Sequence, residues 1–284
     1  MASAYTIVYT AHNTYDTLAK GALWQFMILP ETNTTQQLVR WKMESNLAIK
    51  QHMSLNGLRF NSLQVQTKDN FKRADFEVSF LVLKKAINPF DFVLNNDIAL
   101  DYQELEDLGF KAQNEIYLRK TKYTYLPEPF VSIFIFDRSR SIFENLQELN
   151  HWVYIHLYFK VGVTNIDTPL QDIIEKRHGV CQDFTHLFVA IARHYDIPAR
   201  YVSGYLHQGN GYFGDSQMHA WAEAYVPNGG WIGFDPTNDI LVADNHIKVC
   251  HGIDYADCSP LKGVVYTTGR NTTSHSVEFR MSQQ

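Results

Sequence analysis

The chain has few cysteines, no strongly basic segment and no long apolar run, and each absence argues against a class of protein. Three cysteines among 284 residues are too few and too unevenly spaced for a disulfide scaffold, so we expect a cytoplasmic, reducing location. No uninterrupted apolar run approaches the roughly 18 residues of a membrane span. The first residues also lack the basic stretch and apolar segment of a signal peptide, so we expect no membrane association.

The balance of charges makes nucleic acid a poor candidate partner. Lys and Arg number 25 and Asp and Glu 30, which gives a net charge of −5, and no basic stripe follows the sequence as a phosphate backbone would require. With 45% hydrophobic and 19% charged residues, the chain has the composition of an ordinary globular protein. Its length suits one large domain or two smaller ones.

Alternation of apolar and polar residues dominates the first third of the chain. Val39, Trp41 and Met43 alternate with charged residues. A second run of the same period contains Phe76, Val78, Phe80 and Val82. A period of two is typical of strands with one buried face. We therefore predict a β-rich, sandwich-like domain over residues 1–130, which would act as a scaffold or in substrate docking.

Helical spacing begins near residue 141. Ser141 and Glu144 have the spacing of a capping box, and apolar residues follow at helical intervals. A second helix is expected from Thr168, which precedes a proline suited to a first turn. The next helix is expected to begin at Cys181, with an apolar stripe on one face. That stripe comprises Phe184, Leu187, Phe188, Ile191 and Tyr195.

Cys181 is therefore expected at a helix N-terminus, where a thiol gains reactivity. The unpaired backbone N–H groups of a first helical turn stabilise a thiolate. The same groups are donors for a developing oxyanion. We predict on this basis that Cys181 is a nucleophile. The alternative, from the residue alone, is a small buried cysteine without chemistry.

A histidine follows on a predicted strand over residues 218–226. His219, Trp221, Glu223 and Tyr225 share one face of that strand, and the opposite face carries small apolar residues suited to packing against a helix. An imidazole, an indole and a carboxylate together are unusual for a plain core or a plain surface, so His219 is the expected base. The alternative is a sheet edge with a structural histidine.

Asp235 ends the next predicted strand and is the expected partner of that histidine. A carboxylate there would accept a hydrogen bond from one ring nitrogen of His219 and fix its tautomer. The alternative is an aspartate that only shapes a turn. A simple hairpin with Val226 opposite Trp231 would point Asp235 away from the histidine. We therefore predict an odd-length turn or a bulge within residues 227–231.

Two further features accompany this constellation. Residues 207–217 contain three glycines and are expected to form a mobile loop beside the site. Cys250 and Cys258 are able to pair, or to bind metal with His246 and His251, although neither spacing matches the strong zinc patterns. We therefore expect no metal and no cofactor.

Four motifs, in this order, resemble the core of the bacterial transglutaminase-like superfamily, whose members are often described as candidate cysteine proteases. The motifs are Gly179-Val180-Cys181-Gln182-Asp183-Phe184, Ile197-Pro198-Ala199-Arg200-Tyr201-Val202-Ser203-Gly204-Tyr205, His219-Ala220-Trp221-Ala222-Glu223 and Gly233-Phe234-Asp235-Pro236-Thr237-Asn238. The resemblance covers about residues 140–262. Gln182 and Asp183 match the motif without a role that the residues reveal. Ile253 stands where the family often has arginine, and Cys258 where a small aliphatic residue is usual.

The resemblance implies an α+β fold. Residues 131–284 would form a papain-like transglutaminase core, with helices packed on an antiparallel sheet and additional C-terminal strands. The strand-rich first part is similar to the β domain that precedes the core in this bacterial branch. The resemblance further implies Cys181 as nucleophile, His219 as general base and acid, and Asp235 as the residue that orients the histidine.

We therefore expect a cysteine-dependent acyl-transfer enzyme that acts on a protein or peptide. The Cys181 thiolate would attack an amide carbonyl, His219 would protonate the leaving amine, and water or a second amine would resolve the thioester. Hydrolysis of amide, peptide or isopeptide bonds is favoured, because nothing in the sequence identifies a second substrate site. The alternatives are an amine-incorporating transglutaminase and a non-catalytic peptide-binding or scaffold module. The sequence leaves the oligomeric state open.

Overall fold

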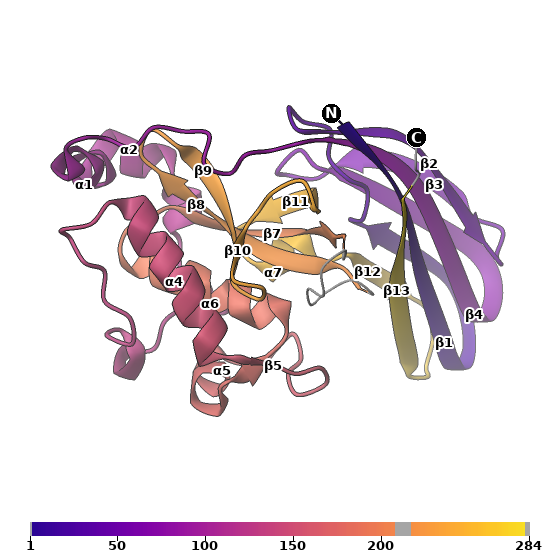
Figure 1. Ribbon diagram of the computed structural model, residues 1–284. Helices are drawn as coiled ribbons and strands as arrows, with labels where there is room; N and C mark the ends of the chain where they lie inside the picture. The colour runs from indigo at the N-terminus through magenta and orange to yellow at the C-terminus, as the bar shows by residue number, and fades with distance from the viewer. Residues whose placement is uncertain (1, 208–216, 282–284) are drawn as a thin grey trace.

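The computed structural model describes residues 2–207 and 217–281, which form two antiparallel sheets and a group of helices (Figure 1). In Figure 1 the six-stranded sheet lies on one side of the molecule and the helices on the other, with a five-stranded sheet between them. The predicted α+β class is thereby confirmed. None of the helices in the described part of the chain has the length and apolar character that a membrane span requires.

Two strands of 25 residues each form the centre of the six-stranded sheet. β1 (Ala2–Phe26) and β4 (Asn61–Lys85) pair antiparallel over nearly their whole length. The register shifts twice along β1, within residues 14–19 and again within residues 20–22. Such irregularities bend a strand pair, so β1 and β4 have two differently oriented halves.

Each half of this central pair has its own neighbours. β2 (Gln36–Ser45) and β13 (Asn271–Met281) flank one half, and β3 (Lys50–Leu55) and β12 (Leu261–Val265) flank the other. The two C-terminal strands, which the sequence places with the predicted core, therefore belong to the N-terminal sheet. The alternation of apolar side chains does not reveal which strand they will pair with, because it reports a buried face and not a partner.

The predicted alternation holds in β4 and breaks once in β2. In β4 the alternating apolar side chains are buried. In β2 a register shift between Leu38 and Arg40 turns the chain, and Val39 is left 46% exposed. A bulge of this kind re-aims a side chain that a strict period of two would have placed in the core.

Residues 86–130 differ from the prediction of a β-rich domain that ends at residue 130. This segment contains the helices α1 (Ile98–Glu106), α2 (Leu108–Gln113) and α3 (Glu115–Leu118) and the 3-10 helix η1 (Glu128–Phe130). Asp97 caps α1 by accepting a hydrogen bond from the N–H of Ala99. Leu105 and Leu126 are buried in the same apolar cluster as the helices of the core. These helices are short, so their apolar residues give little periodic signal.

The five-stranded sheet has the order β10-β9-β8-β7-β11 and is antiparallel throughout. Its strands are β7 (Ala199–Leu206), β8 (His219–Val226), β9 (Gly230–Asp235), β10 (Ile240–Leu241) and β11 (His246–Gly252). Helices α4 (Ile142–His156) and α6 (Cys181–His194) cover one face, where they pack against Ala222 and Ala224. Tyr205 belongs instead to the apolar cluster shared with the six-stranded sheet.

Shorter elements complete the helical layer. They are α5 (Leu170–Lys176), the parallel pair β5 (Tyr158–Phe159) and β6 (His178–Gly179), and α7 (Tyr255–Cys258). The predicted capping box at the start of α4 is present: the N–H of Glu144 donates to the Ser141 hydroxyl, and the N–H of Ser141 donates to the Glu144 carboxylate. The start of α4 therefore follows its capping residue, whereas α5 begins after Pro169 and α6 after Val180 without a side-chain cap.

Buried hydrogen bonds join the two sheets. The side chain of Gln36, in β2, accepts from the backbone N–H of Lys248 at 2.9 Å and donates to the backbone carbonyl of the same residue at 2.7 Å. The Tyr205 hydroxyl donates to the carbonyl of Ile28 at 2.7 Å. Buried donors and acceptors with satisfied partners fix orientation as well as position, so the N-terminal sheet docks on the core in one arrangement.

Candidate active site

Cys181 is the first residue of α6 and is half-buried. The helix therefore begins where the sequence predicts it, and the apolar stripe behind Cys181 anchors it. Phe184, Leu187, Phe188 and Ile191 are each 1% exposed or less, in the cluster between α6 and the five-stranded sheet. The consequence is a sulfur at the edge of the core on a helix whose apolar face is buried.

Asp183 fixes the conformation of the chain just before Cys181 through buried hydrogen bonds and a close contact with Gly179. Its carboxylate is 2% exposed and accepts hydrogen bonds from the backbone N–H of Val180 at 2.8 Å and from the Thr164 hydroxyl at 2.7 Å. Burial raises the pKa of Asp183, and these two hydrogen bonds oppose that rise. A Cβ on Gly179 would stand 2.6 Å from the Asp183 side chain, so this turn accepts only glycine without displacement. Asp183 thus holds the chain that leads into Cys181.

His219 begins β8, which occupies the centre of the five-stranded sheet. The alternative of a sheet edge is therefore wrong, because β8 has β7 on one side and β9 on the other. His219 and Trp221 are each 1% exposed. Gly204, on β7, makes room for the indole: a Cβ there would lie 2.5 Å from the Trp221 ring.

The register of β8 and β9 brings Asp235 to the face of the histidine. Val226 pairs with Gly230, so the turn between the strands contains three residues, and Ala222 pairs with Phe234. Asp235 follows Phe234 and comes opposite Trp221. The predicted odd-length turn is thereby confirmed, and the even register that would have turned the carboxylate away is absent from this strand pair.

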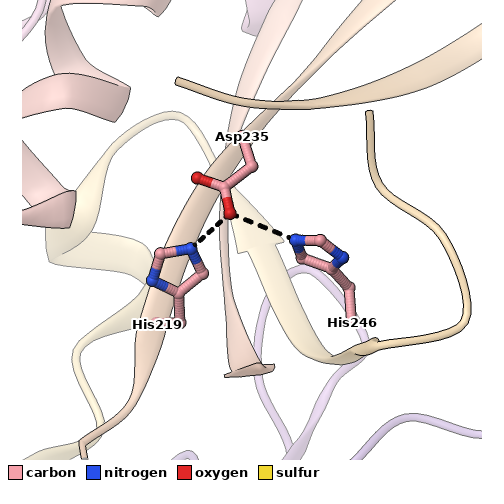
Figure 2. A group of neighbouring side chains, drawn as sticks. All are labelled: His219, Asp235 and His246. Carbon is pink, nitrogen blue, oxygen red and sulfur yellow. Dashed lines mark hydrogen bonds and ion pairs between the residues drawn. The ribbon is translucent and has the colours of Figure 1, made fainter. Parts of the chain in front are cut away.

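Asp235 is fully buried and accepts hydrogen bonds from four of the described residues, and Figure 2 shows those that come from His219 and His246. His219 Nε2 lies 2.7 Å from Oδ2, His246 Nε2 3.2 Å and Asn238 Nδ2 2.8 Å, while the N–H of Thr237 donates to Oδ1 at 3.1 Å. Burial alone would raise the pKa of Asp235, but the charge and hydrogen bonds of the two histidines hold it well below its usual range. The carboxylate is therefore an anion inside the protein.

The two ring nitrogens of His219 have different surroundings. A carboxylate only accepts, so Nε2 carries a proton. Nδ1 is buried and has no hydrogen-bond partner among the residues that the structure describes. Burial alone would lower the pKa of His219, yet the Asp235 charge and hydrogen bond, with a smaller contribution from the Cys181 thiol, raise it to about 10. An imidazole of this basicity is suited to take the proton of a neighbouring thiol.

The structure thus brings the three predicted residues together, while their catalytic roles stay predictions. Cys181 comes from the start of α6, His219 from the start of β8 and Asp235 from the end of β9. A helix N-terminus beside a buried imidazole–carboxylate pair is an arrangement suited to nucleophilic attack on a carbonyl, because its free N–H groups face the developing negative charge.

His246 is a residue of this cluster that the analysis of the sequence missed. We considered it only as one ligand of a metal site with three other residues, and no local signal in the sequence links it to Asp235. It reaches the carboxylate because the chain crosses from β10, at one edge of the sheet, to β11, at the other. Such a contact depends on the complete fold.

His219, Asp235 and His246 are the residues within the described ranges whose spacing suits a metal ion. Their hydrogen bonds do not fit that use. The N–H of Ala243 donates to His246 Nδ1 at 3.5 Å, which leaves the proton on Nε2, the atom that faces Asp235. A metal-bound histidine binds through a bare nitrogen and donates from the other one. The cluster is therefore better described as a hydrogen-bonded network than as a metal site.

The other proposed metal ligands lie elsewhere. Cys250 and Cys258 are buried free thiols and form no disulfide with each other. Burial, with Cys250 as neighbour, raises the pKa of the Cys258 thiol well above its usual value. His251 Nε2 contacts the Tyr117 hydroxyl at 3.0 Å. In the described part of the chain these residues do not join His246 in a group with metal-ligand spacing.

The predicted loop next to the site falls mostly outside the described residues. Residues 208–216, which carry its three glycines, belong to the part of the chain that is not described. The prediction of a mobile loop at this position therefore stays a prediction.

Comparison with known proteins finds similarity in the core to a family model and to proteins of several bacteria. Residues 135–236 match the model of the Transglutaminase-like superfamily. An uncharacterized protein of Mycobacterium tuberculosis is 38% identical over 142 residues, which are 47% of this chain and 45% of that protein. A protein-glutamine gamma-glutamyltransferase of Pseudomonas aeruginosa is 31% identical over 101 residues, which are 34% of this chain and 15% of that protein.

The solved structure of a candidate cysteine protease from Cytophaga hutchinsonii has the same fold over the whole chain. It superposes with a TM-score of 0.76 at 21% sequence identity, and the match covers 100% of this chain and 92% of that one. The chain spans about half the length of the mycobacterial relative, so that relative informs the core and not the whole protein.

Proposed function

Because residues 135–236 form a transglutaminase-like domain, we propose that this protein is a cysteine-dependent enzyme that hydrolyses amide bonds in proteins or peptides. One observation carries the proposal. His219 Nε2 is hydrogen-bonded to the buried Asp235 carboxylate, its Nδ1 has no hydrogen-bond partner in the described residues, and the Cys181 thiol contributes to the raised pKa of the same ring. That arrangement provides a nucleophile, a base and a residue that orients the base.

The reaction proceeds in two steps with the proton passing through His219. Nδ1 takes the proton of the Cys181 thiol, and the thiolate attacks the amide carbonyl. The C–N bond then breaks, the imidazolium gives its proton to the leaving amine, and a thioester remains on Cys181. In the second step His219 deprotonates water, which attacks the thioester and releases the acid and the free thiol.

Asp235 and the start of α6 support the charges that develop. The carboxylate stabilises the imidazolium without taking its proton, because it stays ionised far below neutral pH. In the first turn of α6 the N–H groups of Asp183 and Phe184 donate to the carbonyl of Val180, so the donors for the oxyanion in this proposal are those of Cys181 and Gln182. The N-terminal sheet serves as a scaffold or docking surface for the substrate in this proposal, and a cytoplasmic location remains part of it.

The first test measures the reactivity of the three cysteines. Iodoacetamide at pH 6 should modify Cys181, because an activated thiolate reacts at a pH where ordinary thiols, with a pKa near 8.5, are about 0.3% ionised. Cys250 and Cys258 are buried and act as internal controls that should stay unmodified. Peptide mapping by mass spectrometry identifies the modified residue. Equal labelling of all three, or none of Cys181, contradicts the proposal and favours a non-catalytic module.

The second test separates hydrolysis from transamidation. A peptide library with glutamine side chains and peptide bonds is incubated with the protein, with and without an added primary amine. Carboxylic acid products of hydrolysis that are absent with the Cys181→Ala variant support a hydrolase. Preferential incorporation of the amine would instead assign a transglutaminase, and unchanged hydrolysis by Cys181→Ala would exclude Cys181 as the nucleophile.

A further inference from the structure

The imidazole of His246 has both ring nitrogens engaged and is 1% exposed. Nε2 lies 3.2 Å from Asp235 Oδ2, and Nδ1 accepts from the N–H of Ala243 at 3.5 Å. Trp221 packs edge-on against the ring, with centroids 5.2 Å apart. A buried imidazole held at three sides keeps one orientation, in which its N–H points at the carboxylate (Figure 2).

We propose that His246 is a positioning residue that keeps the Asp235 carboxylate aimed at His219, an inference that rests on the proposed function. Two of the four donors to Asp235, Thr237 and Asn238, belong to the turn that follows it and move with it. The others come from different strands, β8 and β11. His246 is thus the contact that ties the carboxylate to the rest of the fold without taking part in the proton transfer.

A neutral donor is the suitable group for this task. The groups that act on the His246 imidazole are Asp235, His219 and Lys84, and burial outweighs the attraction of Asp235, so its pKa is lowered. A neutral imidazole orients the carboxylate but leaves its negative charge available to His219. A cation in the same place would neutralise that charge and weaken the base.

Two substitutions separate orientation from packing. His246→Leu fills the space without a donor, while His246→Gln carries an amide N–H near the position of Nε2. The rate of Cys181 alkylation by iodoacetamide is measured at pH 6 and pH 10. We expect His246→Leu to lower the rate at pH 6 about tenfold, the usual effect of one hydrogen bond to a charged group, and to change the rate at pH 10 less than twofold. His246→Gln should stay within about threefold of the wild type at both.

His186→Leu is the matched control. His186 is a second buried imidazole, 2% exposed, whose Nε2 accepts from the N–H of Tyr255 and whose ring does not contact the triad. Burial lowers its pKa to about 3, so it is neutral as His246 is. The control variant loses a buried imidazole as well, but its rate ratio between pH 6 and pH 10 should equal that of the wild type.

The inference is overturned if His246→Leu keeps the wild-type ratio of the alkylation rates at pH 6 and pH 10. It is also overturned if this ratio decreases as much in His246→Gln or in His186→Leu as in His246→Leu. A failure of the proposed function looks different, since wild-type Cys181 would then not react at pH 6. Nitrogen NMR of the labelled wild-type protein needs no variant. It should detect His246 as the neutral Nε2–H tautomer at pH 7 to 8, and a charged ring or the Nδ1–H tautomer there would sink the inference.

Discussion

Two groups of polar side chains lie on the same face of β8 and differ in what they leave unsatisfied. The first, which we call the triad group, comprises two residues of the proposed triad, His219 and Asp235, together with His246. The ion-pair group comprises Glu223, Lys248 and Arg200. Trp221 lies between them along the strand, and a cavity of about 490 Å³ between the two sheets is lined by residues of both groups.

In the ion-pair group each oxygen of Glu223 has a cationic partner. Lys248 Nζ lies 2.9 and 2.7 Å from the two oxygens, and Arg200 Nε lies 2.6 Å from one of them. The Arg200 guanidinium also stacks 4.1 Å from the ring centroid of Trp231. Burial alone would raise the pKa of Glu223, but its partners lower it to about 2. The network continues beyond these three residues, because Arg200 Nη1 lies 3.3 Å from His251 Nε2 and Lys248 Nζ 4.0 Å from a carboxylate oxygen of Glu31.

In the triad group one atom is left open. His219 Nδ1 is buried without a hydrogen-bond partner in the described residues, although an unsatisfied buried nitrogen costs stability. The groups differ in that cations satisfy both oxygens of Glu223, whereas His219 Nδ1 is left for a reacting partner such as the Cys181 thiol, which already contributes to the raised pKa of this ring.

Removing the base should have the largest effect on reactivity. We expect His219→Gln to slow the alkylation of Cys181 at pH 6 about a hundredfold, because the thiol loses its proton acceptor and reacts like an ordinary cysteine. The measurement is the rate of iodoacetamide incorporation at this residue. If the rate is unchanged, the open nitrogen of the triad group has no chemical purpose and the contrast between the groups disappears.

Breaking the ion-pair group should affect stability and not reactivity. Glu223→Gln leaves Lys248 and Arg200 without their counter-charge, and we expect the free energy of unfolding in urea to fall by about 3 kcal/mol. Glu115→Gln is the control, since it breaks an exposed pair with Arg119 and should cost less than about 0.5 kcal/mol. Alkylation of Cys181 in Glu223→Gln should stay within twofold, and a tenfold loss would mean that the two groups are coupled.

Lowering the pH should reveal how much the ion-pair group stabilises the fold, because the pKa of Glu223 differs between the folded and unfolded chain. The pKa of Glu223 falls from its ordinary 4.5 to about 2 on folding, so its stabilisation is fully present above pH 4.5 and is lost as the pH falls through 2. Between pH 4.5 and pH 3 this residue should account for roughly 1.5 kcal/mol of the decrease in unfolding free energy. Urea titrations at both pH values, on the wild type and Glu223→Gln, measure the difference. If the unfolding free energy decreased equally in both proteins between pH 4.5 and pH 3, the assignment to Glu223 would be contradicted.

Much of the candidate site was predictable because its signals are local. The start of α6 at Cys181 follows from a glycine stop and an amphipathic stripe, and the face of His219 follows from alternation along one strand. The position of Asp235 needed chemical reasoning in addition: only an odd turn lets the carboxylate reach the imidazole, and the three-residue turn has that length.

The parts that could not be predicted depend on contacts between distant segments. His246 on β11 contacts Asp235 on β9 although β7 and β8 lie between these two strands in the sheet order. Asp183 holds the chain before Cys181 partly through a hydrogen bond from Thr164, which lies in a different loop. The boundary expected at residue 130 differs for a related reason, since strands near the C-terminus complete the N-terminal sheet and short helices join the core. Neither pairing partner nor tertiary hydrogen bond is encoded in the period of a single segment.

The pairing of β13 with β1 has a consequence for how this protein is made. Tyr5 lies opposite Met281 and Tyr15 opposite Asn271, so β1 is separated by more than 250 residues of sequence from the strand that covers this edge. An uncovered edge is a template for unwanted association, and such distant closure is slow. We expect this edge of β1 to need protection, for example by chaperones, until β13 has been synthesised.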